Sequence, residues 1–302
     1  MKTESKIYFY DDLKEKFFGE GPARLLSGVE RTASLHKAAA DMGMAYSKAF
    51  KIIKNAENVL GFPLLISRTG GKRGGGSALT EEGREWLRRY EEYRKSVKEA
   101  EKALFYSHYP EFAFGCVIMA SGLGSRFGGN KLMADFHGRP LIEGSLSVTD
   151  NMFLSRVAVA RNEDTAAYLE GRGINTILHE FPGRNDTVRL GLTEVMKEDV
   201  TGCLFFPADQ PLLKKSSLRA LLSAAAKEPS MIWRLSYEGT PGTPVWFPKA
   251  LFPELLTLPE GKGGGVLCKK YPELVRLVPV TDPSELTDVD TQEDLLRISE
   301  TC

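Results

Sequence analysis

The sequence contains no long apolar run and no apolar segment at its start. Hydrophobic residues make up 42% of the 302 residues, yet no stretch approaches the ~18 uninterrupted apolar residues of a membrane span. Residues 1–6 carry mixed charges, unlike the beginning of a secretory signal. These absences argue against a membrane protein, and we expect a chain that works in the cytoplasm without engaging a membrane.

Cysteine is scarce, and none of the four cysteines lies in a CxxC pair. Their spacings match no zinc-binding pattern, which argues against a structural zinc module. Cys116 and Cys203 lie inside apolar runs typical of strands. We therefore expect buried, reduced thiols, as is usual in a reducing compartment.

The chain has no net charge, because 40 basic residues balance 40 acidic ones. The balance is uneven: residues 1–110 contain 20 basic and 15 acidic residues, a net +5, which leaves −5 for the remainder. A basic front half suggests an anionic partner. The length fits two domains of ordinary size, and we expect them at 1–110 and 111–302, joined by a linker at 108–112.

Residues 1–110 have the element order of a winged helix-turn-helix domain. Helical spacing of apolar residues predicts helices over 23–32 and 46–60, with Ser34 placed to cap a helix between them. Residues 64–80 read as a hairpin with a basic, glycine-rich turn. In such a domain the third helix enters the major groove and the hairpin reaches phosphates. The predicted DNA contacts are therefore Lys48, Lys51, Lys54, Lys72 and Arg73.

The basic surface also fits a second interpretation, a solvated face on a dimerisation module. Residues 20–105 resemble the DNA-binding domain of the molybdate-responsive regulator ModE, through LGFPLL at 60–65, GGKRGGG at 70–76 and LTEEG at 79–83. No paired molybdate-binding domain follows, so the resemblance implies DNA binding but not molybdate sensing. A long charged helix predicted over 81–105 has a broken apolar stripe that fits either a homodimer seam or packing on its own domain.

After residue 112 the pattern changes to apolar strands alternating with helices. Strands are predicted over 115–120, 156–160 and 202–206, and helices over 141–148, 163–172, 187–196 and 217–227. Alternation of this kind predicts a mostly parallel sheet covered on both faces. The fold class is therefore α/β, with a winged helix in front.

The segment ASGLGSRFGGNK at 120–131 is the strongest chemical signal. It follows a strand and is rich in glycine, which permits the dihedral angles of a loop whose amides point at a triphosphate. Arg126 and Lys131 add positive charge that would stabilise developing negative charge on phosphate oxygens. The segment is neither a Walker A loop nor GxGxxG.

A second signal is FPADQPLL at 206–213, which places Asp209 at the end of an apolar strand. Ligands of open parallel sheets bind at the carboxyl ends of the strands. A carboxylate there can hold Mg²⁺ that bridges triphosphate oxygens. The alternative is an aspartate that serves only the turn before Pro211.

Together these segments resemble the MobA/MocA-like nucleotidyltransferases of molybdenum cofactor synthesis, over residues 114–299. FPADQPLL, GTPV at 242–245, LFPELL at 251–256 and DVDTQEDL at 288–295 are similar to the cytosine-specific MocA branch. The resemblance implies a Rossmann-like, GT-A-like fold, Mg²⁺ as cofactor, and CTP or GTP with a molybdopterin-type phosphorylated acceptor as substrates.

The resemblance also implies roles for individual residues. Arg126 and Lys131 would hold the triphosphate, and Asp209, with Asp290 as a second ligand, would hold the metal. Asp290 could instead be a helix N-cap. GRNDTVRLGL at 183–192 resembles the base-contacting segment. The implied nucleotide-binding residues are Ala120, Ser121, Gly122, Gly124, Lys131 and Thr187.

Two departures from the family pattern bear on the substrates. Ser121 replaces the expected alanine or glycine beside the base, which leaves CTP and GTP both open. Lys262 stands where an aspartate is usual, in a loop that the resemblance assigns to the acceptor side.

The leading hypothesis is transfer of CMP from CTP to molybdopterin, fused to a DNA-binding dimer. The alternatives are a transcription regulator with a non-catalytic sensing domain, or transfer to another phosphorylated acceptor.

Overall fold

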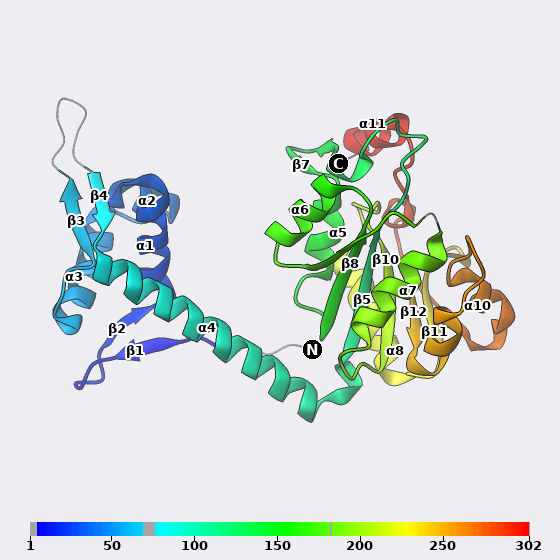
Figure 1. The fold of residues 1–302 in the computed structure, drawn as a ribbon, viewed down its shortest axis with the longest axis horizontal. Helices are drawn as coiled ribbons and strands as arrows, with labels where there is room; N and C mark the ends of the chain where they lie inside the picture. The colour runs from blue at the N-terminus through cyan, green and yellow to red at the C-terminus, as the bar shows by residue number, and fades with distance from the viewer. Residues whose placement is uncertain (1–4, 69–75, 182, 302) are drawn as a thin grey trace. The chain divides into compact units, whose positions relative to one another are not determined.

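The computed structural model describes residues 5–68, 76–181 and 183–301 of the chain. The chain divides into two compact units, one ending at Leu104 and the other beginning at Phe105. Each unit is described by itself (Figure 1). Within the described ranges, no helix has the length and apolar character needed to cross a membrane.

The N-terminal unit contains the helices and hairpin expected from the sequence, preceded by a hairpin that the sequence analysis did not predict. Its strands pair as β1 with β2 and as β3 with β4, both antiparallel. In chain order the elements are β1 (Tyr8–Tyr10), β2 (Lys16–Gly19), α1 (Glu20–Thr32), α2 (Leu35–Asp41), α3 (Tyr46–Leu60), β3 (Leu65–Arg68), β4 (Gly76–Leu79) and α4 (Glu81–His108).

Local signals set the ends of these helices. The side chain of Ser34 caps α2 by accepting a hydrogen bond from the Lys37 amide at 3.3 Å, as predicted. Gly43, with a φ of +65°, turns the chain between α2 and α3. On α3 the buried carboxylate of Glu57 accepts from the amides of Leu64 and Leu65, at 2.8 and 3.1 Å. Glu57 thereby connects α3 to the start of β3, the first strand of the β3–β4 hairpin.

The first half of α4 packs against its own unit. Leu87 and Tyr90 belong to the same buried cluster as Phe18, Leu25 and Ile53. Tyr93 and Leu104, farther along the helix, are 52% and 61% exposed. The structure therefore supports packing on the domain for the first half of the predicted stripe.

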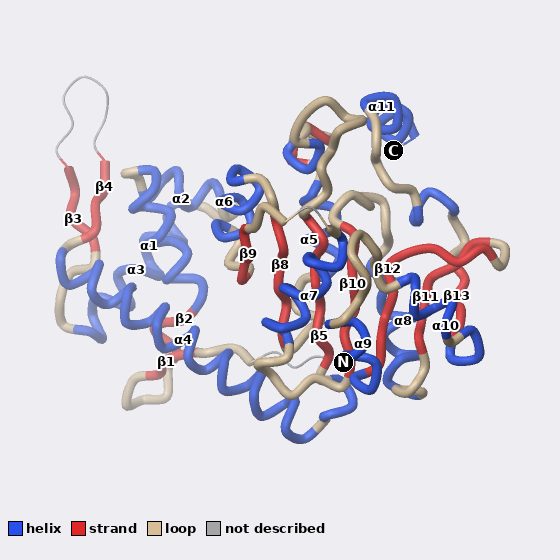
Figure 2. The backbone as a smooth tube through the Cα atoms, turned by 45° about the vertical axis from the view of Figure 1, so that its right-hand side comes forward, coloured by secondary structure: helices blue, strands red, loops and turns tan. Residues whose placement is uncertain are grey.

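The second unit is built on a seven-stranded sheet in the order β13-β11-β12-β10-β5-β8-β9, and Figure 2 shows the strands side by side in this sequence. All neighbours pair in parallel except β12, which runs antiparallel to both β10 and β11. The predicted mostly parallel sheet is confirmed. The strands are β5 (Phe114–Ala120), β8 (Ser155–Ala160), β9 (Asn175–Leu178), β10 (Gly202–Pro207), β11 (Ile232–Tyr237), β12 (Thr240–Pro248) and β13 (Val275–Pro279), with a separate pair β6 (Asp135–Phe136) and β7 (Arg139–Pro140).

Helices cover both faces of this sheet. On one face, α5, α6 and α8 contribute to a buried cluster with Cys116 and Ile118 of β5. On the other, α7, α9 and α10 contribute to a second buried cluster with Val117 of the same strand. Alternate residues of β5 thus face opposite layers, as expected for a central strand. The helices are α5 (Ile142–Thr149), α6 (Glu163–Gly171), α7 (Arg184–Val195), α8 (Lys215–Lys227), α9 (Phe252–Leu256), α10 (Gly265–Lys270) and α11 (Gln292–Thr301).

The strand order reverses between β5 and β10. From β5 the chain moves outward through β8 to β9, then returns through α7 to β10 on the other side of β5. In open α/β sheets such a reversal leaves a crevice at the carboxyl ends of the two strands, where ligands bind. Ala120 ends β5, and Asp209 lies two residues beyond the end of β10. The fold therefore brings both predicted chemical segments to the same edge.

Candidate active site

The loop after β5 folds back on itself around two glycines. Gly124 has a φ of +59° and Gly128 a φ of +78°, in the left-handed region that favours glycine. The amides of Phe127 and Gly128 donate to the Gly124 carbonyl oxygen at 2.9 and 3.2 Å. A Cβ on Gly124 would lie 2.8 Å from the Gly129 carbonyl oxygen. The tight turn beyond β5 therefore requires glycine at position 124.

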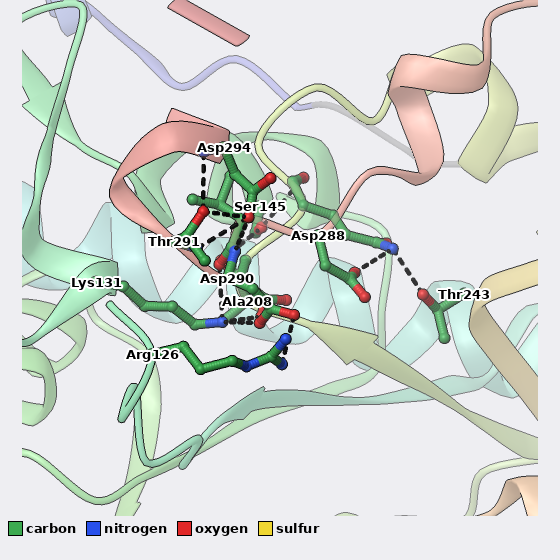
Figure 3. A network of polar contacts seen from close by, with 12 residues as sticks. Arg126, Lys131, Ser145, Ala208, Thr243, Asp288, Asp290, Thr291 and Asp294 are labelled. Atoms are coloured by element: carbon green, nitrogen blue, oxygen red, sulfur yellow. Dashed lines mark hydrogen bonds and ion pairs between the residues drawn. The ribbon is translucent and has the colours of Figure 1, made fainter. Parts of the chain in front are cut away.

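The ammonium group of Lys131 lies between two carboxylates (Figure 3). Its Nζ is 2.5 Å from Asp209 Oδ2 and 3.1 Å from Asp290 Oδ1, and it donates to the Val289 carbonyl oxygen at 2.9 Å. The backbone supports this meeting, because the Val289 amide donates to the Asp209 carbonyl oxygen at 3.0 Å. Two distant segments, at Asp209 and at 289–290, thus converge on the ammonium group of Lys131.

Arg126 joins the cluster from the glycine-rich loop. Its Nη2 donates to Asp290 Oδ2 at 2.7 Å, while 71% of its side chain remains exposed. The guanidinium therefore retains accessible donors for an anionic ligand. Of the predicted site residues, the structure brings Arg126, Lys131, Asp209 and Asp290 into one network.

The helix-capping alternative for Asp290 is wrong. Thr291 Oγ1 accepts from the Asp294 amide at 3.1 Å, and Asp294 Oδ2 accepts from the amides of Thr291 and Asp290 at 2.9 and 3.2 Å. Thr291 and Asp294 therefore cap α11 reciprocally. The Asp290 side chain points instead toward Lys131 and Arg126 (Figure 3).

The charges of the site hold Lys131 in its protonated form. Burial lowers the pKa of Lys131, but the nearby carboxylates of Asp209 and Asp290 outweigh burial and raise the pKa above its usual value. Two cations and two carboxylates balance one another here, because Arg126 pairs with the same Asp290. A cation that binds these carboxylates must therefore exchange with the Lys131 ammonium group, whereas an anion can still reach the exposed donors of Arg126.

A buried amide that was not among the predicted site residues holds a further carboxylate, Asp288. Gln210 is fully buried, and its Nε2 donates to Asp288 Oδ1 at 2.9 Å and to Thr243 Oγ1 at 2.6 Å. Burial, followed by repulsion from Asp209 and Asp290, raises the pKa of Asp288. The sequence signal was weak: Gln210 adjoins Asp209, but no local pattern encodes a contact across 78 residues.

The hydroxyl groups of Ser121 and Thr187 hydrogen bond to each other and join the end of β5 to α7. Arg161, which the sequence analysis missed, donates to the carbonyl oxygens of Ser121 at 3.1 Å, Glu180 at 2.9 Å and Phe181. It fixes the chain beyond β5 and β9. Its place directly after β8, at the carboxyl end of a parallel strand, was a usable signal.

The predicted DNA contacts differ in their surroundings. Lys48 and Lys51 are exposed on α3. Lys54 is also exposed but pairs with Glu57 at 2.7 Å, which partly neutralises its charge. Lys72 and Arg73 lie outside the described residues.

Asp209 and Asp290 fit a divalent cation as hard oxygen donors. Both carboxylates contact the same ammonium group, so their oxygens are close enough to share one ion. Across the described ranges, no group of three or more His, Cys, Asp or Glu side chains could hold a metal. Two carboxylates suit Mg²⁺, which commonly takes one or two protein ligands and completes its shell with water and substrate phosphates.

Comparison with known proteins shows the family of the second unit. Residues 116–275, more than half of the chain, match the family described as the MobA-like NTP transferase domain. The chain belongs to this family. The match includes the loop after β5, Lys131 and Asp209, so the MobA-like domain contains most of the charged cluster.

The N-terminal unit matches a different family. Residues 23–84 match the bacterial regulatory helix-turn-helix proteins of the lysR family. The molybdenum transport protein ModE of Azotobacter vinelandii is 36% identical over 67 residues, which cover 22% of this chain and 25% of that protein. The chain is therefore a MobA-like NTP transferase domain fused to a helix-turn-helix region.

Relatives of the MobA-like domain include a molybdenum cofactor guanylyltransferase of Pseudomonas aeruginosa, 29% identical over 128 residues, 41% of this chain and 62% of that protein. The crystal structure of Rv0371c from Mycobacterium tuberculosis H37Rv is 25% identical with a TM-score of 0.55, covering 63% of this chain and 98% of that chain. A manganese complex of Rv0371C matches at 22% identity with a TM-score of 0.52, covering 63% of this chain and 100% of that chain. The chain spans a quarter of the ModE relative and less than two thirds of the guanylyltransferase.

Proposed function

We propose that the MobA-like domain transfers CMP from CTP to the phosphate of molybdopterin and releases pyrophosphate. The observation that carries this proposal is the convergence of Arg126, Lys131, Asp209 and Asp290 where the strand order reverses. Cations and carboxylates at such an edge suit a metal-bound polyanion. The fold and family membership support nucleotidyl transfer as the reaction class.

The transfer needs no acid–base or covalent residue. A bond forms between an acceptor phosphate oxygen and the α-phosphorus as the bond from that phosphorus to the bridging oxygen breaks, and pyrophosphate carries away the electron pair. Arg126 and Lys131 would neutralise charge on the triphosphate and on the leaving group. Ala120, Gly122 and Gly124 would provide backbone for the nucleotide to lie against. Positioning and charge therefore carry the catalysis.

Asp209 and Asp290 would hold Mg²⁺, which would neutralise phosphate charge and orient the triphosphate when bound. The manganese complex of Rv0371C supports a divalent ion in this fold. Lys131 contacts both carboxylates, so binding of metal and triphosphate would move its ammonium group from the carboxylates to the phosphates.

Ser121 and Thr187 would contact the base. Their paired hydroxyls retain one hydroxyl hydrogen for an outside acceptor, since each hydroxyl has one donor and the pair uses only one. CTP is our choice from the sequence motifs. GTP is the alternative, and the name of the Pseudomonas aeruginosa relative supports it.

A pyrophosphate-release assay tests the proposal with CTP and GTP, each with and without molybdopterin and Mg²⁺. We expect release only when CTP, acceptor and metal are all present. A Lys131→Ala variant with full activity would contradict the role of the charged cluster. Release with GTP but not with CTP would leave nucleotidyl transfer as the reaction and make GTP the nucleotide substrate. Release that depends on a different phosphorylated acceptor would replace molybdopterin.

We also propose that residues 1–110 form a DNA-binding winged helix that acts as a homodimer in the cytoplasm, ahead of a catalytic domain at 111–302. The helix-turn-helix match and the exposed Lys48 and Lys51 support DNA binding. The second candidate function is a transcription regulator whose MobA-like domain senses a ligand without turnover. The same helix-turn-helix match supports it. Tight operator binding with no pyrophosphate release from either nucleotide would favour the regulator.

A further inference from the structure

A basic pocket lies on the α7 and α10 face of the second unit. Its volume is about 700 Å³, and its lining includes the cationic side chains of Arg184, Arg234, Lys262 and Lys269. Among the described residues, the lining contains no aspartate or glutamate. A cavity of this size accommodates a whole small-molecule ligand.

Within the described ranges, these four cations lack the carboxylate partners that some of their neighbours have. The nearby Arg189 and Lys270 form ion pairs with Asp186 and Glu254, at 3.2 and 2.6 Å. Over the part of the chain that the structure describes, Arg184, Arg234, Lys262 and Lys269 form no ion pair. Four unpaired cations around one cavity create a positive potential that a bound anion would relieve.

The remaining lining suits an apolar body. Pro241, Val266 and Leu277 contribute to the wall between the charged groups. Arg234 is held in place, because its Nε donates to the Gly242 carbonyl oxygen at 3.0 Å. The pocket therefore combines a guanidinium held by a hydrogen bond, two lysine side chains and apolar surface. This combination matches an organic anion with a ring-sized body better than an inorganic ion.

Two connections join the pocket to the candidate active site. On β12, Pro241 lines the pocket, while Thr243, two residues later, accepts from Gln210 beside Asp209. The Gly261 amide donates to Asn185 Oδ1 at 2.9 Å, which ties the loop bearing Lys262 to the start of α7. On α7, Thr187 bonds to Ser121 at the end of β5. The pocket and the candidate active site are thus both built on β12 and α7.

We propose that this pocket binds the non-reacting end of the acceptor, and that this end carries negative charge on an apolar, ring-sized body. The inference rests on the proposed nucleotidyl transfer and adds a second requirement to it. The reacting phosphate enters the crevice near Lys131, while a second anionic group of the same molecule pairs with Lys262, Lys269 and the two arginines. A simple phosphate monoester without a remote anion would be a poor acceptor.

The binding test uses naphthalene-1,5-disulfonate, an apolar ring system with two anionic groups. Calorimetric titration of the full chain is made with the crevice filled by Mg²⁺ and cytidine 5′-(α,β-methylene)triphosphate. The Lys262→Glu/Lys269→Glu double variant is compared with Lys215→Glu, because Lys215 is exposed on α8, away from the pocket lining. We expect the double variant to bind at least ten-fold more weakly, and the control to bind like the wild type. Equal affinity in all three proteins, or no binding to the wild type, would overturn the inference.

A kinetic arm separates the pocket from the reaction. In pyrophosphate release, the double variant should raise the KM for molybdopterin at least ten-fold and leave the KM for CTP within two-fold, which also shows that the crevice is folded. Lys269→Glu alone should give a smaller shift in the same direction. An unchanged acceptor KM in an active double variant refutes the pocket assignment and leaves the transfer intact. No release from the wild type refutes the proposed transfer itself.

Discussion

Replacing Lys131 with methionine should tighten metal binding while it strongly slows nucleotidyl transfer. The Lys131 ammonium group contacts both Asp209 and Asp290, at 2.5 and 3.1 Å, and so competes with a divalent ion for the same oxygens. Methionine is unbranched and flexible, so it can fill the space left by the lysine stem without adding charge.

The size of the effect follows from Coulomb's law. Two unit charges about 4 Å apart interact with about 1 kcal/mol in water, so a unit charge and a divalent ion repel by about 2 kcal/mol. Removing that repulsion should lower the Kd for the metal about thirty-fold. This change in affinity is a lower bound, because it assumes the screening of bulk water. Lys131 is only 10% exposed, so the screening around it is weaker.

Calorimetric titration of the full chain with Mn²⁺, without nucleotide, measures this difference. The variant should also gain more thermal stability from the metal than the wild type, since the ion binds only the folded state. Pyrophosphate release should fall by about a hundred-fold or more, the usual cost of removing a group that stabilises developing charge. A Lys131→Met/Asp209→Asn double variant provides the control and should lose the added affinity. Metal affinity in Lys131→Met equal to or below that of the wild type would refute the shared-oxygen argument.

Three further predictions concern other parts of the chain. Burial would raise the pKa of Glu57, but hydrogen bonds from Lys54 and two backbone amides outweigh it and lower the pKa below its usual value. Its stabilising effect is therefore present above the unfolded pKa and is lost as pH falls through the lower folded value. Glu57→Gln should cost about 1–2 kcal/mol at neutral pH and cost less below about pH 4, and equal cost at both pH values in urea unfolding would contradict this. Lys51→Ala should reduce the salt dependence of duplex DNA binding by about one unit of logarithmic slope. Lys54→Ala should reduce it less, because Lys54 is already paired with Glu57. Fluorescence anisotropy at several salt concentrations measures both slopes, and equal slopes for the two variants would contradict the assignment. A Cβ on Gly191 of α7 would lie 2.4 Å from Val117 Cγ1 of β5, so Gly191→Ala should destabilise the second unit by about 1–3 kcal/mol, and an unchanged urea midpoint would show that the helix can shift freely.

Much of the fold could be predicted because its signals are local. Helical spacing predicted α3 at Tyr46–Leu60, and the hydroxyl of Ser34 predicted the start of α2. Apolar runs predicted β5, β8 and β10. The β1–β2 hairpin was missed because strands of three and four residues carry too little alternation to be recognised. The antiparallel β12 was missed because strand direction depends on partners elsewhere in the chain.

The sequence by itself determined the parts of the candidate site: a loop that needs glycine at position 124, the cations that follow it, and an aspartate after an apolar strand. Glycine dihedral angles and strand periodicity are encoded within a few residues. Only the tertiary structure decided which parts meet. Lys131 reaches Asp290 across 159 positions and Gln210 reaches Asp288 across 78, while the basic pocket draws cations from α7, β11, α10 and the loop before α10. Such convergence depends on strand order and on the antiparallel insertion of β12, because these set which loops share an edge of the sheet.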